Sequence, residues 1–151
     1  MIYKQQFLSL FFMISIFSII QNPSLNCDTS EVSIPVEVTC ETFEKEILGA
    51  KIPVVLYIYE LESLPCQDLH PIFAEMCQKC SSDIKFATMN LDKNESFADM
   101  CGVQNGPLFF VYYQGEFITE FEYFESQEEL RQICAEILNM CEEIDAQNLK
   151  N

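Results

Sequence analysis

The stretch VVLYIYELESLPCQDLHPIF, residues 54–73, places an apolar strand directly before the start of a helix. Residues 54–59 are β-branched, aromatic and apolar on both faces, which predicts a central strand covered by helices on both sides. Residues 65–80 carry apolar side chains at helical spacing, so we expect a helix there. Pro71 should kink it, because proline lacks an N–H donor and clashes with the preceding turn.

On both sides of this stretch, further strands and helices alternate, and the expected order is βαβαβαββα. The expected strands lie at 32–38, 54–59, 84–91, 108–113 and 116–124, and the other helices lie near 43–48, at 95–101 and from Ser126 onward. Helices between strands imply crossovers on both faces of a mixed sheet, and the final hairpin supplies an antiparallel edge. In that edge strand, alternation predicts that Phe117, Thr119, Phe121 and Tyr123 share one face. The fold class is therefore α/β.

From about residue 32 to 138 the chain resembles thioredoxin and the thioredoxin-like domains of protein disulfide isomerases. The resemblance rests on the central strand followed by SLPC at 63–66, on Pro71, on GVQNGP at 102–107 and on the hairpin YQGE at 113–116. In that family these segments are the active-site Cys-x-x-Cys at a helix start, the kinking proline, the loop with a cis proline and a β-hairpin. The resemblance implies a thioredoxin-like fold and no cofactor.

The active-site segment departs from the family at its first cysteine. Ser63 takes the attacking position, and only Cys66 keeps its sulfur. Thiol–disulfide exchange needs an attacking thiolate and a resolving thiol, so the two-cysteine cycle cannot run through this pair. The resemblance therefore implies a cleft that binds polypeptide at Ser63, Cys66, Gly106 and Pro107, by backbone pairing with the loop before the proline.

Two interpretations of Cys66 stay open. It is either a reactive thiol that catalyses monothiol chemistry, or a half-buried or structurally paired residue of a non-catalytic domain. His70 lies four residues later, so a Cys–His pair on one helix face is an alternative. The resemblance also matches Tyr57 to a buried acid of the family, which removes the usual proton acceptor.

The cysteines of the two long helices are candidates for structural disulfides. Cys77 and Cys80 form a C-x-x-C motif at a helix end, where the macrodipole disfavours a thiolate. Cys134 and Cys141 are separated by a helical rise of about 10.5 Å, beyond the reach of about 7 Å between bridged Cα atoms. In the thioredoxin-like fold that the resemblance implies, both helices pack on one face of the sheet. A disulfide such as Cys80–Cys141 is therefore geometrically reasonable. With one histidine in the chain, we expect no metal site.

The N-terminus predicts a targeting segment. An apolar run at 7–20 follows a start that contains one lysine and no acid, which fits a signal-peptide core and is too short to span a bilayer. We therefore expect a signal peptide at 1–26 and a thioredoxin-like domain at 27–151, with an uncleaved anchor as the alternative. An oxidising compartment, either the endoplasmic reticulum lumen or the cell exterior, makes disulfides feasible and Asn94-Glu95-Ser96 a glycosylation sequon.

Composition limits the classes of partner that the protein is expected to bind. The chain has 151 residues, 49% of them hydrophobic, and a formal net charge of −16. The length and the hydrophobic content predict a single domain with a core. The acidic net charge would be repelled by the phosphate backbone of a nucleic acid. The leading hypothesis is a secretory, protein disulfide isomerase-related domain that binds unfolded or cysteine-containing polypeptides, without nucleic acid and, once the signal is removed, without membrane. The alternatives are an active oxidoreductase that uses Cys66 with another cysteine, and a non-enzymatic acidic module that binds calcium.

Overall fold

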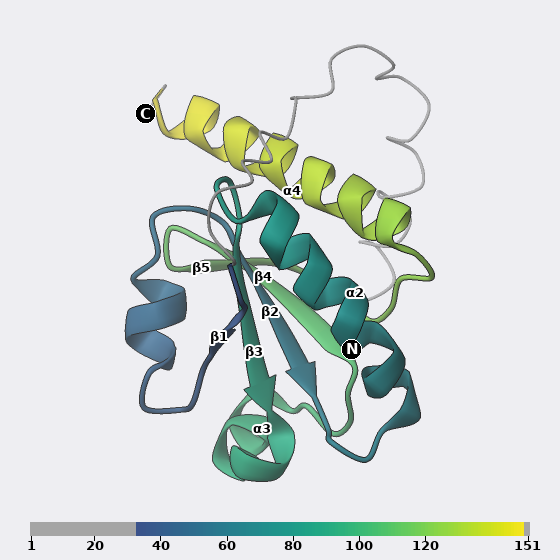
Figure 1. The fold of residues 1–151 in the computed structure, drawn as a ribbon. Coiled ribbons are helices and arrows are strands. Elements are labelled where there is room, and N and C mark those ends of the chain that lie inside the picture. Colours follow the sequence, from purple (N-terminus) through teal and green to yellow (C-terminus); the bar gives the residue numbers. More distant parts are fainter. Residues whose placement is uncertain (1–32, 150–151) are drawn as a thin grey trace, which may run out of the picture.

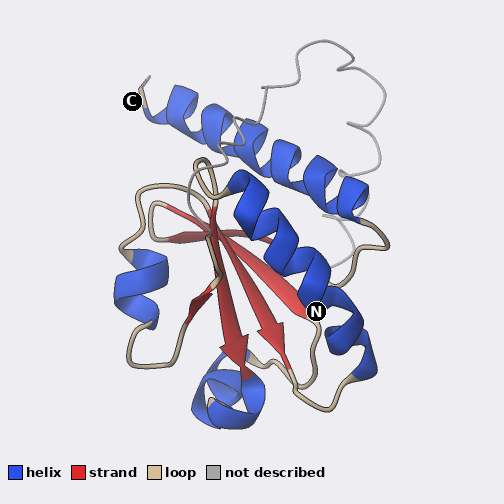
Figure 2. Cartoon of the chain, viewed as in Figure 1, coloured by secondary structure: helices blue, strands red, loops and turns tan. Residues whose placement is uncertain are grey.

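The computed structural model describes residues 33–149 and contains a five-stranded sheet with helices on both faces (Figures 1 and 2). The predicted leader at 1–26 lies outside the described residues. The strands are β1 (Val36–Glu37), β2 (Val54–Tyr59), β3 (Lys85–Asn90), β4 (Leu108–Tyr113) and β5 (Glu116–Phe121). The helices are α2 (Leu64–Cys80), α3 (Glu95–Cys101) and α4 (Gln127–Asn148), with a π-helical turn η2 (Glu44–Leu48) and a short 3-10 turn η3 (Leu91–Lys93).

The sheet is mixed, as the alternating elements predicted. Its spatial order is β1-β3-β2-β4-β5, in which β1, β3 and β2 run parallel while β4 and β5 are antiparallel to their neighbours. Parallel neighbours need crossover connections, and α2 provides the one between β2 and β3. The central position of β2 brings the start of α2 to the end of the sheet where β4 begins.

The strand β2 divides the interior into two cores. Val55 and Tyr57 face the side covered by α2 and α4, whereas Val54, Leu56 and Ile58 face the side covered by η2 and α3. All five side chains are buried. The expectation from the uninterrupted apolar run is therefore confirmed, because a strand covered on both faces has no polar side.

The first two elements differ from expectation. β1 is shorter than 32–38, and Val36 and Glu37 pair only with β3 at the edge of the sheet. The segment near 43–48 forms a π-helical turn instead of an α-helix. Gly49 N–H donates a 2.8 Å hydrogen bond to the Glu44 carbonyl, and a Cβ on Gly49 would lie 2.7 Å from a backbone oxygen. The glycine therefore permits the wide turn.

The predicted alternation along the last strand is wrong. The ladder register shifts between Val111 and Tyr112, which leaves an extra residue in β5. Phe117 packs edge-on against Phe110 on the η2 side, while Phe121 stacks on Phe109 on the α2 side. A bulge reverses the face of the residues that follow it, and a pattern of period two does not reveal it.

The two long helices and the hairpin are confirmed, whereas the kink at Pro71 stays a prediction. Pro71 lies inside α2, which continues past it to Cys80. At the start of α4, the Ser126 hydroxyl accepts a hydrogen bond from Glu129 N–H. Gln114 and Gly115 both have positive φ, as a tight type I′ hairpin requires. No helix within residues 33–149 is both long and apolar enough to cross a membrane.

Candidate functional site

The helix α2 begins at the carboxyl end of β2, as the sequence predicted. Ser63 is its N-cap residue, with extended backbone, and its hydroxyl accepts no capping hydrogen bond. Its carbonyl accepts the first bond of the helix, from Gln67 N–H at 3.0 Å. Ser63 thus presents a half-buried hydroxyl at the positive end of the helix dipole. An alcohol there is a hydrogen-bonding group and not a redox group.

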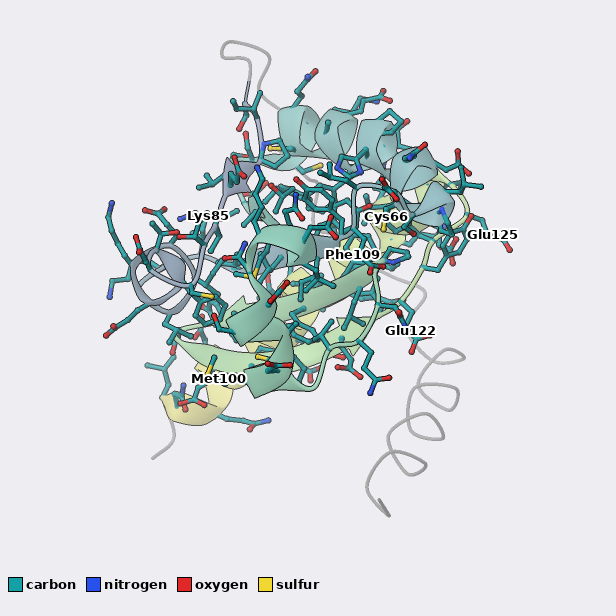
Figure 3. All side chains as sticks on the ribbon, turned by 90° about the horizontal axis from the view of Figure 1, so that it is seen from below. Cys66, Lys85, Met100, Phe109, Glu122 and Glu125 are labelled. Atoms are coloured by element: carbon teal, nitrogen blue, oxygen red, sulfur yellow. The ribbon has the colours of Figure 1, made fainter. Side chains whose placement is uncertain are left out.

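Cys66 lies one turn further along α2 and has an exposed fraction of 0%. It belongs to the core between the sheet and the α2–α4 layer, together with Phe109 and Leu69. In Figure 3 its side chain lies in the interior, whereas Met100, Glu122 and Glu125 lie at the margin. A thiol enclosed in this way cannot meet the disulfide of a folded partner unless α2 opens.

Tyr57 and His70 surround the backbone of Cys66. The Tyr57 hydroxyl donates to the Cys66 carbonyl at 2.9 Å, and His70 Nδ1 lies 2.7 Å from the same oxygen. Because a carbonyl only accepts, Nδ1 carries the proton and donates. The predicted proximity of Cys66 and His70 is therefore real, but the contact of the imidazole is with a backbone oxygen.

Tyr57 does not supply the proton acceptor that the resemblance implies for this strand. Burial raises the pKa of Tyr57 well above its usual range, and the nearby Cys66 adds to the effect. A phenol in this state donates a hydrogen bond and does not take a proton. Its ring stacks on Phe109 with the ring centroids 4.7 Å apart. Tyr57 is therefore a structural link between the strand and the helix.

The loop before β4 lies beside this end of α2. The bond between Gly106 and Pro107 is cis, as the resemblance implied. A Cβ on Gly106 would lie 3.3 Å from the Cys66 sulfur and 3.0 Å from both Ile58 O and Tyr59 Cα. The structure therefore brings Cys66, Gly106 and Pro107 to one place, with Ser63 at the N-terminus of the same helix.

Sequence reasoning missed the role of one residue in this site. No motif in the sequence singles out Glu60, but its Oε2 accepts a 3.2 Å hydrogen bond from Gly106 N–H. The two residues are 46 positions apart. The available signal was weak: a carboxylate that directly follows a central strand stands at the end of the sheet where loops converge.

The four helix cysteines proposed as disulfide partners share the α2–α4 core, and each is at most 5% exposed. Burial raises the pKa of Cys134 to about 12, with a further contribution from Cys80. Burial likewise raises the pKa of Cys77 and of Cys141, the latter to about 11. These thiols are unsuited to attack. The pairing of these four cysteines in structural disulfides, such as Cys80–Cys141, stays a prediction.

The sequon residue Asn94 faces inward. It is 6% exposed, its Oδ1 accepts from Cys40 N–H at 3.1 Å, and its Nδ2 donates to the Asn90 carbonyl at 2.8 Å. Glycosylation would attach a sugar to this same Nδ2. The folded domain therefore places the acceptor nitrogen where a glycan does not fit.

Metal binding finds no support in the part of the chain that the structure describes. Within residues 33–149, no group of three or more His, Cys, Asp or Glu side chains could hold a metal ion. The calcium-binding alternative thus gains no site from these residues.

Comparison with known proteins gives consistent matches. Residues 34–136 match the family model described as thioredoxin. Thioredoxin 1 of Synechococcus elongatus is 29% identical over 85 residues, which are 56% of this chain and 79% of that protein. Thioredoxin of Rickettsia bellii is 30% identical over 79 residues (52% and 75%), and thioredoxin 1 of Nostoc sp. is 27% identical over 85 residues (56% and 79%).

Proposed function

This chain belongs to the thioredoxin family, and from that premise we propose that it is a secretory, protein disulfide isomerase-related member that binds extended or unfolded polypeptides. In this proposal it has at most monothiol redox chemistry. One observation carries the proposal: the start of α2 presents the hydroxyl of Ser63, while the one sulfur of the motif, that of Cys66, is fully buried.

The chemistry of exchange explains why this observation matters. In the first step a thiolate attacks a disulfide sulfur, a new S–S bond forms and a thiolate leaves. The Ser63 oxygen cannot form such a bond, and the Cys66 sulfur is enclosed. With Tyr57 protonated and His70 bonded to a carbonyl, neither residue acts as a base toward the thiol. These residues are therefore compatible with polypeptide binding but not with turnover by thiol–disulfide exchange.

Insulin reduction tests the redox part of the proposal. We expect the unaltered protein to show no turnover above that of Cys66→Ala. We expect Ser63→Cys to gain turnover, because the new thiol would stand at the helix N-terminus with Cys66 as its resolving partner. Turnover by the unaltered protein that disappears in Cys66→Ala would establish the alternative, an active oxidoreductase using Cys66 with another cysteine.

The test of polypeptide binding needs a ligand that cannot take part in disulfide exchange. An unfolded polypeptide with carboxymethylated cysteines serves this purpose, and its affinity is measured by calorimetry. We expect saturable binding by both the unaltered protein and Cys66→Ala, since the proposal assigns recognition to backbone pairing near Gly106. If neither protein binds the ligand, the proposed function is wrong.

The secretory assignment rests on the residue pattern at 1–26 and has its own test. After expression in eukaryotic cells, N-terminal sequencing of protein recovered from the medium should give a start near residue 27. A chain that keeps its first residues and stays with the membrane fraction would support an uncleaved anchor instead.

A further inference from the structure

The Glu60 carboxylate accepts a hydrogen bond from the backbone N–H group of Gly106, in the loop that we propose binds polypeptide. β2 and β4 are antiparallel with Ile58 opposite Leu108, so the chain leaving β2 and the loop entering β4 meet at one end of the sheet (Figure 1). There Glu60 Oε2 accepts the hydrogen bond from Gly106 N–H at 3.2 Å. In the absence of a ligand, this N–H group therefore already has an acceptor.

The position of this N–H group is fixed by close packing. A Cβ on Gly106 would lie 3.0 Å from the Ile58 oxygen and the Tyr59 Cα, which shows how near the loop backbone runs to the end of β2. Both contacts are with backbone atoms, which cannot turn aside as a side chain can. The Gly106 donor and the Glu60 carboxylate thus face each other from two rigid segments.

The Glu60 carboxylate has an N–H partner but no cation. Within residues 33–149, the ion pairs of the structure are Lys45–Glu46, Lys79–Glu75, Lys85–Glu46, Lys93–Glu37 and Arg131–Glu128. Glu60 is half-buried, so the contact with Gly106 N–H replaces part of its lost hydration. If another acceptor took that N–H group, the carboxylate would lose this compensation.

We infer that Glu60 makes the proposed binding site selective for polypeptide segments that carry Lys or Arg beside the residue that pairs with Gly106. This inference rests on the proposed polypeptide binding. An incoming backbone carbonyl displaces Glu60 as the acceptor of Gly106 N–H. A cationic side chain of the ligand then pairs with the displaced carboxylate, whereas an acidic side chain meets it with repulsion.

The test compares three cysteine-free peptides of one extended sequence that differ at a central residue, which is Lys, Gln or Glu. Their affinities are measured by calorimetry for the unaltered protein, Glu60→Gln, Glu60→Ala and Glu62→Gln. The last variant is the matched control, because Glu62 is exposed and lies two residues further in the same loop. It removes an equal charge and so corrects for attraction by the acidic surface as a whole.

We expect the unaltered protein to bind the Lys peptide more tightly than the Gln peptide by up to about fivefold, the scale of one partly exposed ion pair. Glu60→Gln should abolish this preference, and Glu62→Gln should retain most of it. Glu60→Ala should in addition bind the Gln peptide more tightly than the unaltered protein does, because Gly106 N–H is then vacant.

Four results would overturn the inference. A preference that persists in Glu60→Gln excludes the carboxylate as its source. An equal loss in Glu60→Gln and Glu62→Gln assigns the preference to overall charge. Equal binding of all three peptides by the unaltered protein refutes selectivity but leaves the proposed function intact, whereas absence of any binding refutes both.

Discussion

The Tyr57 hydroxyl donates a 2.9 Å hydrogen bond to the Cys66 carbonyl and thereby joins the central strand β2 to the first turns of α2. Because His70 Nδ1 donates to the same oxygen, loss of one donor does not leave the carbonyl unpaired. We expect Tyr57→Phe to lower the free energy of unfolding by about 1 kcal/mol. Urea denaturation measures this, with Tyr123→Phe, an exposed site, as the control. Equal losses in both variants would contradict the link.

Gly106 should not tolerate a larger residue. In Gly106→Ala the added methyl group would meet backbone atoms of Ile58 and Tyr59 at 3.0 Å, so the loop must move away from β2. We expect a loss of about 1–3 kcal/mol, the usual cost of overpacking. Because the Glu60 contact depends on the same approach, the amide resonance of residue 106 should shift as well. A variant as stable as the unaltered protein would show that the loop is loosely held.

The buried thiols predict a loss of stability in alkali. The pKa of Cys134 is raised from 9.0 to about 12 and that of Cys141 to about 11, chiefly by burial. Between pH 9 and these values the unfolded chain releases protons that the folded chain keeps. Stability therefore falls as pH rises, by up to about 1.4 kcal/mol per pH unit for each thiol.

Urea midpoints between pH 7.5 and 10.5, measured under reducing conditions, check this expectation. Cys134→Ala should give a shallower decline, because one of the two thiols is gone, while Met100→Ala, at an exposed site without a titratable group, should leave the slope unchanged. If the reduced protein keeps a constant midpoint through this range, the thiols are accessible to water in the folded state.

Asn94 should act as a structural residue and not as a glycan acceptor. Asn94→Ala removes the acceptor of Cys40 N–H and the donor to the Asn90 carbonyl, so we expect a loss of about 1–3 kcal/mol. Ser96→Ala destroys the sequon but keeps the Asn94 amide, and should cost less. Mass spectrometry of protein from a glycosylating host should find Asn94 unmodified. A mass shift that Ser96→Ala removes would show that the site is glycosylated before folding.

Much of the fold could be predicted because its signals are local. The apolar run at 54–59 predicts a strand buried on both faces, and the helical spacing after it predicts α2 with its start beside Ser63. Such patterns involve residues only a few positions apart, so they can be recognised without knowledge of any tertiary contact. The β5 bulge escaped prediction, because the ladder with β4 decides where an extra residue is placed.

The sequence alone determined that a hydroxyl, that of Ser63, stands three residues before Cys66, since this is a matter of residue identity. Only the tertiary structure decided that the Cys66 thiol is enclosed, that Asn94 points inward and that Glu60 reaches Gly106. Each of these facts depends on a residue more than forty positions away, as with Cys40 and Asn94 or with Glu60 and Gly106. Burial and pairing are properties of the assembled core, because chain packing, and not local pattern, sets which polar groups lose water and which partners replace it.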